Sequence, residues 1–197
     1  MGVIIDEKLN WKNHVDYIST KLSKSIGIIL KARTKLPQDA LRTLYFTFVY
    51  PYLTYCIHVW GNSSKRNHNQ IYKLQRKIVR IITSSGYTAD TDVLFTQTKL
   101  MKTYDIYKYS VAVFMYKYHN NMLPDLFNNI YTLSSSVHSH NTRQLYSYAL
   151  PLCKSSLTQN SIVYMGPKIW NSLLDNIKSI VTLNSFKFTL KRLFTSA

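Results

Sequence analysis

Four basic residues in the middle of the chain carry its strongest chemical signal. Lys73, Arg76, Lys77 and Arg80 stand at i, i+3, i+4 and i+7, so a helix would gather them on one side. No acidic residue interrupts the run. Such a row of cations neutralises phosphates without reading bases. The alternative is a solvated helix surface, which is what most charge runs are.

The charge of the whole chain favours the phosphate interpretation. Its 197 residues include 25 Lys and Arg against 9 Asp and Glu, a formal net charge of +16. Such a chain repels itself unless an anion neutralises it, and nucleic acid is the usual partner. We therefore add Lys65 and Arg66, at the start of the same helix, to the expected contacts. An acidic membrane surface is the rival, but no apolar run reaches about 18 residues and we expect no membrane partner.

The acidic residues do not predict a catalytic centre. Nucleotidyl transfer with two metal ions needs converging carboxylates, and the closest pairs are Asp6-Glu7 and Asp90-x-Asp92. Neighbours on a strand point to opposite faces, so Asp6 and Glu7 are poor co-ligands. Asp90 or Thr91 is a better candidate for a helix cap. We expect no catalytic residue in this chain.

Metal and cofactor sites are not predicted either. Cys56-x-His58 and His138-x-His140 are half-sites without a second matching pair. Cys56 and His58 lie in an apolar stretch and are expected in the core, whereas His138 and His140 lie in a polar loop. No glycine-rich phosphate loop occurs, and no Ser/His/Asp or Cys/His arrangement is apparent. We expect no metal and no cofactor.

The N-terminus lacks the features of a signal peptide, and two cysteines are too few for a disulfide framework. We expect an intracellular protein, in the nucleus or the cytoplasm, with reduced thiols. The 16 Tyr residues suit half-buried positions and base contacts equally, and composition does not separate the two.

Hydrophobic periodicity predicts a mainly α fold, a helical bundle with a short N-terminal strand and a small, partly extended, helical C-terminal region. The strand is Met1–Ile5, which has no evident partner. The main helices are expected at residues 11–31, 40–60, 65–83 and 102–119. Residues 40–60 are apolar almost all round, which predicts a central buried helix with a kink at Pro51. Extended segments are expected at 145–150 and 161–164, with a helix starting at Gly166-Pro167.

Several blocks resemble one known family, in order along nearly the whole chain. Residues 2–6 (GVIID) and 9–14 (LNWKNH) are followed by VYPYLTYC at 49–56, LQRKIVR at 74–80, HNTR at 140–143 and GPKIWNSL at 166–173. Together they are similar to the region after the palm in reverse transcriptases of non-LTR, Jockey-like retrotransposons.

This resemblance implies a domain plan and a function. Residues 1–10 would be a remnant strand of the palm and primer-grip edge, 11–131 a helical thumb-like domain, 132–144 a polar loop or linker, and 145–197 a C-terminal helical tail. By resemblance, the thumb holds RNA or an RNA–DNA duplex through its backbone, and Arg143 joins the contacts. The polymerase motif lies upstream of this segment, so we expect a fragment inactive alone, with the missing palm and fingers as a possible partner.

Two other hypotheses stay open from the sequence. The chain is a decayed transposon remnant in one of them, and a helical interaction module with no activity of its own in the other. Salt-dependent binding to nucleic acid would distinguish the phosphate-binding hypothesis from both.

Overall fold

The computed structural model describes residues 2–134 and 147–195, and within them the chain is mainly helical, as predicted. In this described part there is no named strand, and the β-type pairing is an isolated antiparallel bridge between Leu133 and Tyr148. The chain divides into two compact units, Met1–Tyr107 with Leu193–Ala197 and Lys108–Arg192. No helix in the described ranges is both long and apolar enough to cross a membrane.

The predicted N-terminal strand is wrong for the residues described, 2–5. The Ile4 N–H donates to Nδ1 of His14 at 3.3 Å, and not to a neighbouring strand. Ile4 and Ile5 are exposed. A single strand cannot satisfy its backbone groups without a partner, so the β-branched residues alone do not form one.

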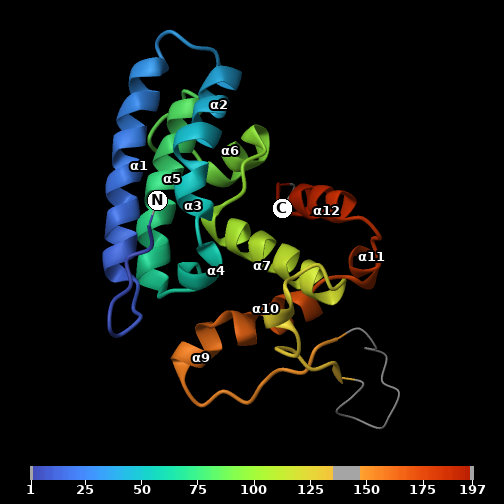
Figure 1. Cartoon of the computed structure of the whole chain (residues 1–197). Coiled ribbons are helices and arrows are strands. Elements are labelled where there is room, and N and C mark those ends of the chain that lie inside the picture. Colours follow the sequence, from blue (N-terminus) through green and yellow to red (C-terminus); the bar gives the residue numbers. More distant parts are fainter. Residues whose placement is uncertain (1, 135–146, 196–197) are drawn as a thin grey trace. The chain divides into compact units, whose positions relative to one another are not determined.

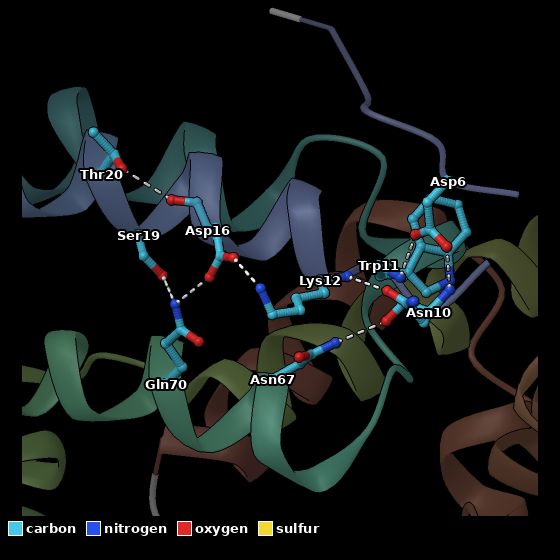
Figure 2. Close-up of polar contacts among 9 residues, drawn as sticks. All are labelled: Asp6, Asn10, Trp11, Lys12, Asp16, Ser19, Thr20, Asn67 and Gln70. Atoms are coloured by element: carbon cyan, nitrogen blue, oxygen red, sulfur yellow. Dashed lines mark hydrogen bonds and ion pairs between the residues drawn. The ribbon is translucent and has the colours of Figure 1, made fainter. Parts of the chain in front are cut away.

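Asp6 organises the turn into the first helix, α1 (Lys12–Ala32). Its carboxylate accepts the backbone N–H groups of Lys8, Asn10 and Trp11 at 2.9–3.1 Å. These bonds, that from Asn10 foremost, lower the pKa of Asp6. The Asn10 side chain, one residue before the N-cap Trp11, accepts the Lys12 N–H at 2.9 Å (Figure 2). The start of α1 is therefore fixed by side chains next to it in sequence.

Unit one is built around two long helices that lie side by side, α1 and α5 (Lys65–Ile82) (Figure 1). Both match the predicted ranges. The apolar stripe of α1 is buried as its periodicity predicted, with Val15, Ile18, Leu22, Ile26 and Ile29 at most 6% exposed. Tertiary packing of this stripe, more than local propensity, stabilises a helix of this length.

The single helix predicted for 40–60 is wrong. The structure has three helices there, α2 (Gln38–Phe48), α3 (Tyr50–Thr54) and α4 (Ile57–Trp60). Pro51 lies in the first turn of α3, where its missing N–H is harmless, so it begins a new helix and does not kink a continuous one. Cys56 interrupts the chain again with a φ of 50°.

The segment is also not buried all round. Burial is limited to one stripe, formed by Leu41, Tyr45, Val49, Leu53, Ile57 and Trp60. Phe48 and Val59 are exposed, and so is Cys56, which corrects its expected place in the core; His58 is partly exposed. Apolar composition overstated burial because exposed positions in helices also accept aromatic and β-branched residues.

The last helix that belongs wholly to unit one is α6 (Thr91–Thr98), and of the two predicted cap candidates, Asp90 and Thr91, it is Asp90 that occupies its N-cap. The Asp90 carboxylate accepts the N–H of Asp92 at 3.0 Å. From α2, the Arg42 Nε–H donates to the Thr98 carbonyl at the end of α6 at 2.9 Å. These bonds hold α6 against the rest of the unit.

Unit two contains most of α7 (Thr103–His119), the short 3-10 helix η1 (Asp125–Phe127), α9 (Ser156–Asn160), α10 (Ile162–Asn171), α11 (Asp175–Lys178) and most of α12 (Leu183–Thr195). Its core is aromatic. Trp170 is fully buried, and the rings of Tyr116 and Phe186 stack at 4.3 Å. The Tyr116 hydroxyl is within 2.8 Å of the carbonyls of Ile180 and Val181, so the chain before α12 is held to α7.

The extended segment predicted at 161–164 is wrong, because α10 begins at Ile162 and carries Gly166 and Pro167 inside it. Met165, Gly166, Ile169 and Trp170 form its buried face. A Cβ on Gly166 would meet the Met115 sulfur and the Tyr131 hydroxyl at 2.8 Å. Close packing on this face outweighs the helix-breaking tendency of the Gly-Pro pair. Residues 145 and 146 of the other predicted extended segment lie outside the described residues.

Candidate nucleic-acid interface

Helix α5 carries six Lys and Arg residues and no acidic residue. The Ser64 side chain caps its first turn by accepting the Asn67 N–H at 3.3 Å. Ile71, Ile78, Val79, Ile81 and Ile82 are buried, which confirms an inward apolar face, although Leu74 is only partly buried. The cations lie on the remaining surface, as the spacing predicted.

Buried amides fix the orientation of α5, and sequence reasoning missed them. Gln75 is fully buried, and its amide donates to the Tyr45 hydroxyl at 2.8 Å and to the Met101 carbonyl at 2.9 Å. Its carbonyl accepts both the N–H and the hydroxyl of Thr103. These four bonds join α5 to α2 and to the start of α7, so α5 cannot rotate without leaving buried polar groups unpaired.

Two further amides of α5 reach the N-terminal part of the chain. Asn67 donates to the Asn10 carbonyl at 2.9 Å, and Gln70 donates to Asp16 at 2.9 Å and to the Ser19 hydroxyl at 3.0 Å (Figure 2). In the sequence, the one sign of this role was that Asn67 and Gln70 lie at helical spacing beside the apolar residues of α5. They set the distance between the polar edges of α1 and α5.

The structure separates the expected basic contacts into two groups. Lys65, Arg66, Lys73 and Lys77 are exposed, and none of them forms an ion pair in the described ranges. At about 100° per residue, Arg66, Lys73 and Lys77 fall within about 40° of one another around α5. We call these three residues the basic stripe.

Arg76 and Arg80 form the second group, and their guanidinium groups are already bonded within the protein. Arg76 donates to the Thr91 hydroxyl at 2.9 Å and lies over the Tyr72 ring. Arg80 donates from two nitrogens to the Ala89 carbonyl at 3.1 and 3.3 Å. Both therefore hold the start of α6 and the turn before it against α5. Arg143 lies outside the described residues.

A groove of about 740 Å³ runs between α1 and α5 beside the basic stripe. Ser19 and Ser23 line it from α1, and Arg66, Asn69, Gln70, Lys73 and Leu74 line it from α5. Its walls thus offer hydroxyls, amides and two cations, which are the groups that commonly contact phosphate and sugar oxygens. The sequence did not single out Ser19 and Ser23, although their spacing of four residues places them on one side of α1.

The Asp16 carboxylate, which is bonded to the groove residue Gln70, is already paired with a lysine. Asp16 accepts from Gln70 and pairs with Lys12 at 3.2 Å (Figure 2). The hydrogen bond from Gln70, together with Lys12, lowers the pKa of Asp16, and the positive charge of Arg66 adds to the effect. Lys12 therefore balances the charge of this acid, while Arg66 and Lys73 on the groove wall form no ion pair in the described ranges.

Four other carboxylates have structural partners. Asp6 and Asp90 accept backbone N–H groups, Asp92 pairs with Lys102 at 3.1 Å, and Asp175 pairs with Lys178 at 3.1 Å. Within residues 2–134 and 147–195, no group of three or more His, Cys, Asp or Glu side chains is placed to hold a metal ion. His138 and His140 lie outside these ranges.

Three curated proteins share sequence with this chain. The probable RNA-directed DNA polymerase from transposon X-element of Drosophila melanogaster is 27% identical over 108 residues, 53% of this chain and 12% of the relative. The RNA-directed DNA polymerase from mobile element jockey of Drosophila funebris is 29% identical over 126 residues, 62% of this chain and 13% of the relative. The probable RNA-directed DNA polymerase from transposon BS of Drosophila melanogaster is 27% identical over 90 residues, 44% of this chain and 10% of the relative.

No family model matches the chain, and no solved structure matches it. The chain spans about an eighth of the length of the first two relatives. The three relatives nevertheless agree with one another and with the resemblance that the sequence blocks indicated. Over roughly half its length, this chain is therefore related in sequence to the RNA-directed DNA polymerases of non-LTR retrotransposons.

Proposed function

We propose that the chain binds nucleic acid through the basic stripe and the groove between α1 and α5. The observation that carries this proposal is the position of Arg66, Lys73 and Lys77, which are exposed, without ion pairs in the described ranges, and beside a groove lined with hydroxyls and amides. A net charge of +16 supplies the long-range attraction. Contacts of this type hold the sugar–phosphate backbone and do not select a sequence.

Within a polymerase, the stripe would hold the template–primer, as RNA or as an RNA–DNA duplex. The names of the relatives support this part, because an RNA-directed DNA polymerase must hold both strands. We propose further that the chain alone transfers no nucleotide. Support comes from the carboxylates, since Asp6, Asp16, Asp90, Asp92 and Asp175 already cap backbone groups or pair with lysines. Incorporation of nucleotides by the purified chain on a primed template would contradict this second part.

A pair of charge reversals tests the binding surface. The double variant Lys73→Glu, Lys77→Glu reverses two charges of the basic stripe. The control variant Lys24→Glu, Lys35→Glu reverses the charges of two exposed lysines elsewhere, so the net charge of the chain changes by the same amount. Because two phosphate contacts are lost, we expect the first variant to bind a duplex at least about tenfold more weakly. The control should lose no more than about twofold, through the change in net charge alone.

Affinity is measured by fluorescence anisotropy at one fixed salt concentration, on an RNA–DNA duplex and on a DNA duplex of different sequence. The stripe variant should lose affinity for both duplexes alike, because phosphate contacts are independent of sequence. Equal losses in the two variants would show that net charge, and not this surface, determines binding.

A further inference from the structure

Tyr87 lies in the turn between α5 and α6 and is 89% exposed, more than any other Phe, Trp or Tyr side chain in the described ranges. Most of the tyrosines that the structure describes are at least partly covered, so its exposure is unusual. Its neighbours Ser84, Gly86 and Thr88 are small or polar and also exposed. The ring is therefore not part of a continuous apolar patch along this turn, which a protein partner would favour.

The turn that carries Tyr87 is held in place by several hydrogen bonds. The Ser85 N–H donates to the Arg80 carbonyl at 3.0 Å, and the Ala89 N–H donates to the Gly86 carbonyl at 3.2 Å. Arg80 in turn donates two N–H groups to the Ala89 carbonyl. A turn fixed at both sides of Tyr87 presents its ring with little conformational freedom left to lose on binding.

One face of the ring already has a cation against it. The Arg80 guanidinium lies over Tyr87 at 5.6 Å from the ring centre. Such a contact positions the ring and adds positive charge behind it. With most of the side chain exposed, the other face is open to solvent.

Tyr87 also lies where the basic stripe ends. Arg80 follows Lys77 by three residues on α5, and Arg66 to Arg80 spans about 21 Å of helix at about 1.5 Å per residue. A strand whose phosphates lie along Arg66, Lys73 and Lys77 would therefore have Tyr87 next to it beyond Lys77.

We propose that Tyr87 stacks on an unpaired base of a nucleic acid whose backbone lies on the basic stripe. This inference rests on the proposed function and adds single-stranded nucleic acid, or the unpaired end of a duplex, to its ligands. Aromatic rings stack on every base, so the site selects unpaired bases without selecting a sequence. The cation behind the ring suits an anionic ligand better than an apolar one.

The test compares wild type with Tyr87→Ala and Tyr87→Phe in the full chain. The probes are a labelled single strand of about 12 nucleotides, within the usual site size, and a blunt duplex of the same length. Phe188→Ala is the matched control, because Phe188 is 63% exposed and has the Arg192 guanidinium over its ring at 5.8 Å. Affinity is measured at several salt concentrations.

We expect Tyr87→Ala to weaken single-strand binding by about fivefold or more, and blunt-duplex binding by less than about twofold. Tyr87→Phe should retain wild-type affinity, since stacking needs the ring and not the hydroxyl. The salt dependence should not change, because no charge is removed.

Equal effects of Tyr87→Ala on both probes would overturn the stacking inference and leave the basic stripe in place. The same would follow if Phe188→Ala weakened single-strand binding as much as Tyr87→Ala. If the wild-type chain bound neither probe, both proposals would be wrong.

Discussion

At the scale of single residues, cations of one helix have different roles according to what lies beside them. Arg76 and Arg80 donate to Thr91 and to the Ala89 carbonyl, whereas Lys73 and Lys77 have no ion pair in the described ranges. The division matches the chemistry of the side chains, because a guanidinium donates in fixed directions and a lysine ammonium is a flexible point charge. Sequence spacing predicted the shared surface but not this division, which depends on the turn at 83–90.

The division predicts separate effects on stability and binding. Arg76→Lys with Arg80→Lys keeps the charge but loses hydrogen bonds to Thr91 and Ala89, each worth about 1 kcal/mol. We expect a lower free energy of unfolding in urea, by about 1–3 kcal/mol, with duplex affinity almost unchanged. The double variant Lys73→Gln, Lys77→Gln should instead lose duplex affinity and keep its free energy of unfolding almost unchanged. A double Arg→Lys variant that kept its stability and lost its affinity would assign both arginines to the ligand.

At the scale of helices, the sequence predicted those with a long and regular apolar stripe. The ranges of α1 and α5 were predicted because four or more apolar residues recur at spacings of three and four. The break of 40–60 into α2, α3 and α4 was not predicted. The stripe from Leu41 to Trp60 continues through all three helices, so periodicity alone gives no sign of the interruptions at Val49 and Cys56. The amide of Gln75 was missed for a related reason, since a pattern of apolar residues does not show which polar ones are buried.

Two glycines in this unit should respond oppositely to the same substitution. A Cβ on Gly61, at the end of α4, would overlap the Ile57 carbonyl and the Tyr107 ring. Gly61→Ala should therefore destabilise the chain by about 1–3 kcal/mol, as overpacking does. Gly27 is inside α1 with nothing within 4 Å of such a Cβ, and Gly27→Ala should stabilise by about 0.5–1 kcal/mol. Urea unfolding of both variants measures this, and a stabilised Gly61→Ala would contradict the packing around α4.

At the scale of the whole chain, one buried and two half-buried histidines make stability depend on pH near neutrality. Burial lowers the pKa of His14, His68 and His119 below the ordinary 6.5. At pH below 6.5 the unfolded chain therefore binds more protons than the folded one, so acid favours unfolding. His14 adds a specific contact, since its Nδ1 accepts the Ile4 N–H and loses that ability once protonated.

The free energy of unfolding should accordingly be greatest above about pH 6.5 and fall as the pH drops through the folded-state pKa values. His14→Gln should show a smaller fall, because one of the three groups no longer titrates. Urea unfolding curves at several pH values between about 5 and 8 measure the dependence. A chain that became more stable on acidification over this range would contradict the burial of these rings.

The proposed function depends on counterion release from the basic stripe, so the most direct measurement is the salt dependence of duplex binding. The slope of log affinity against log salt should be negative for the wild type, by about 0.9 for each phosphate contacted. In the double variant Lys73→Gln, Lys77→Gln, the slope should become shallower by the amount that corresponds to about two phosphate contacts. In the control variant Lys24→Gln, Lys35→Gln, the slope should stay unchanged. A wild-type affinity that does not depend on salt, or equal slopes in all three proteins, would contradict binding through this surface.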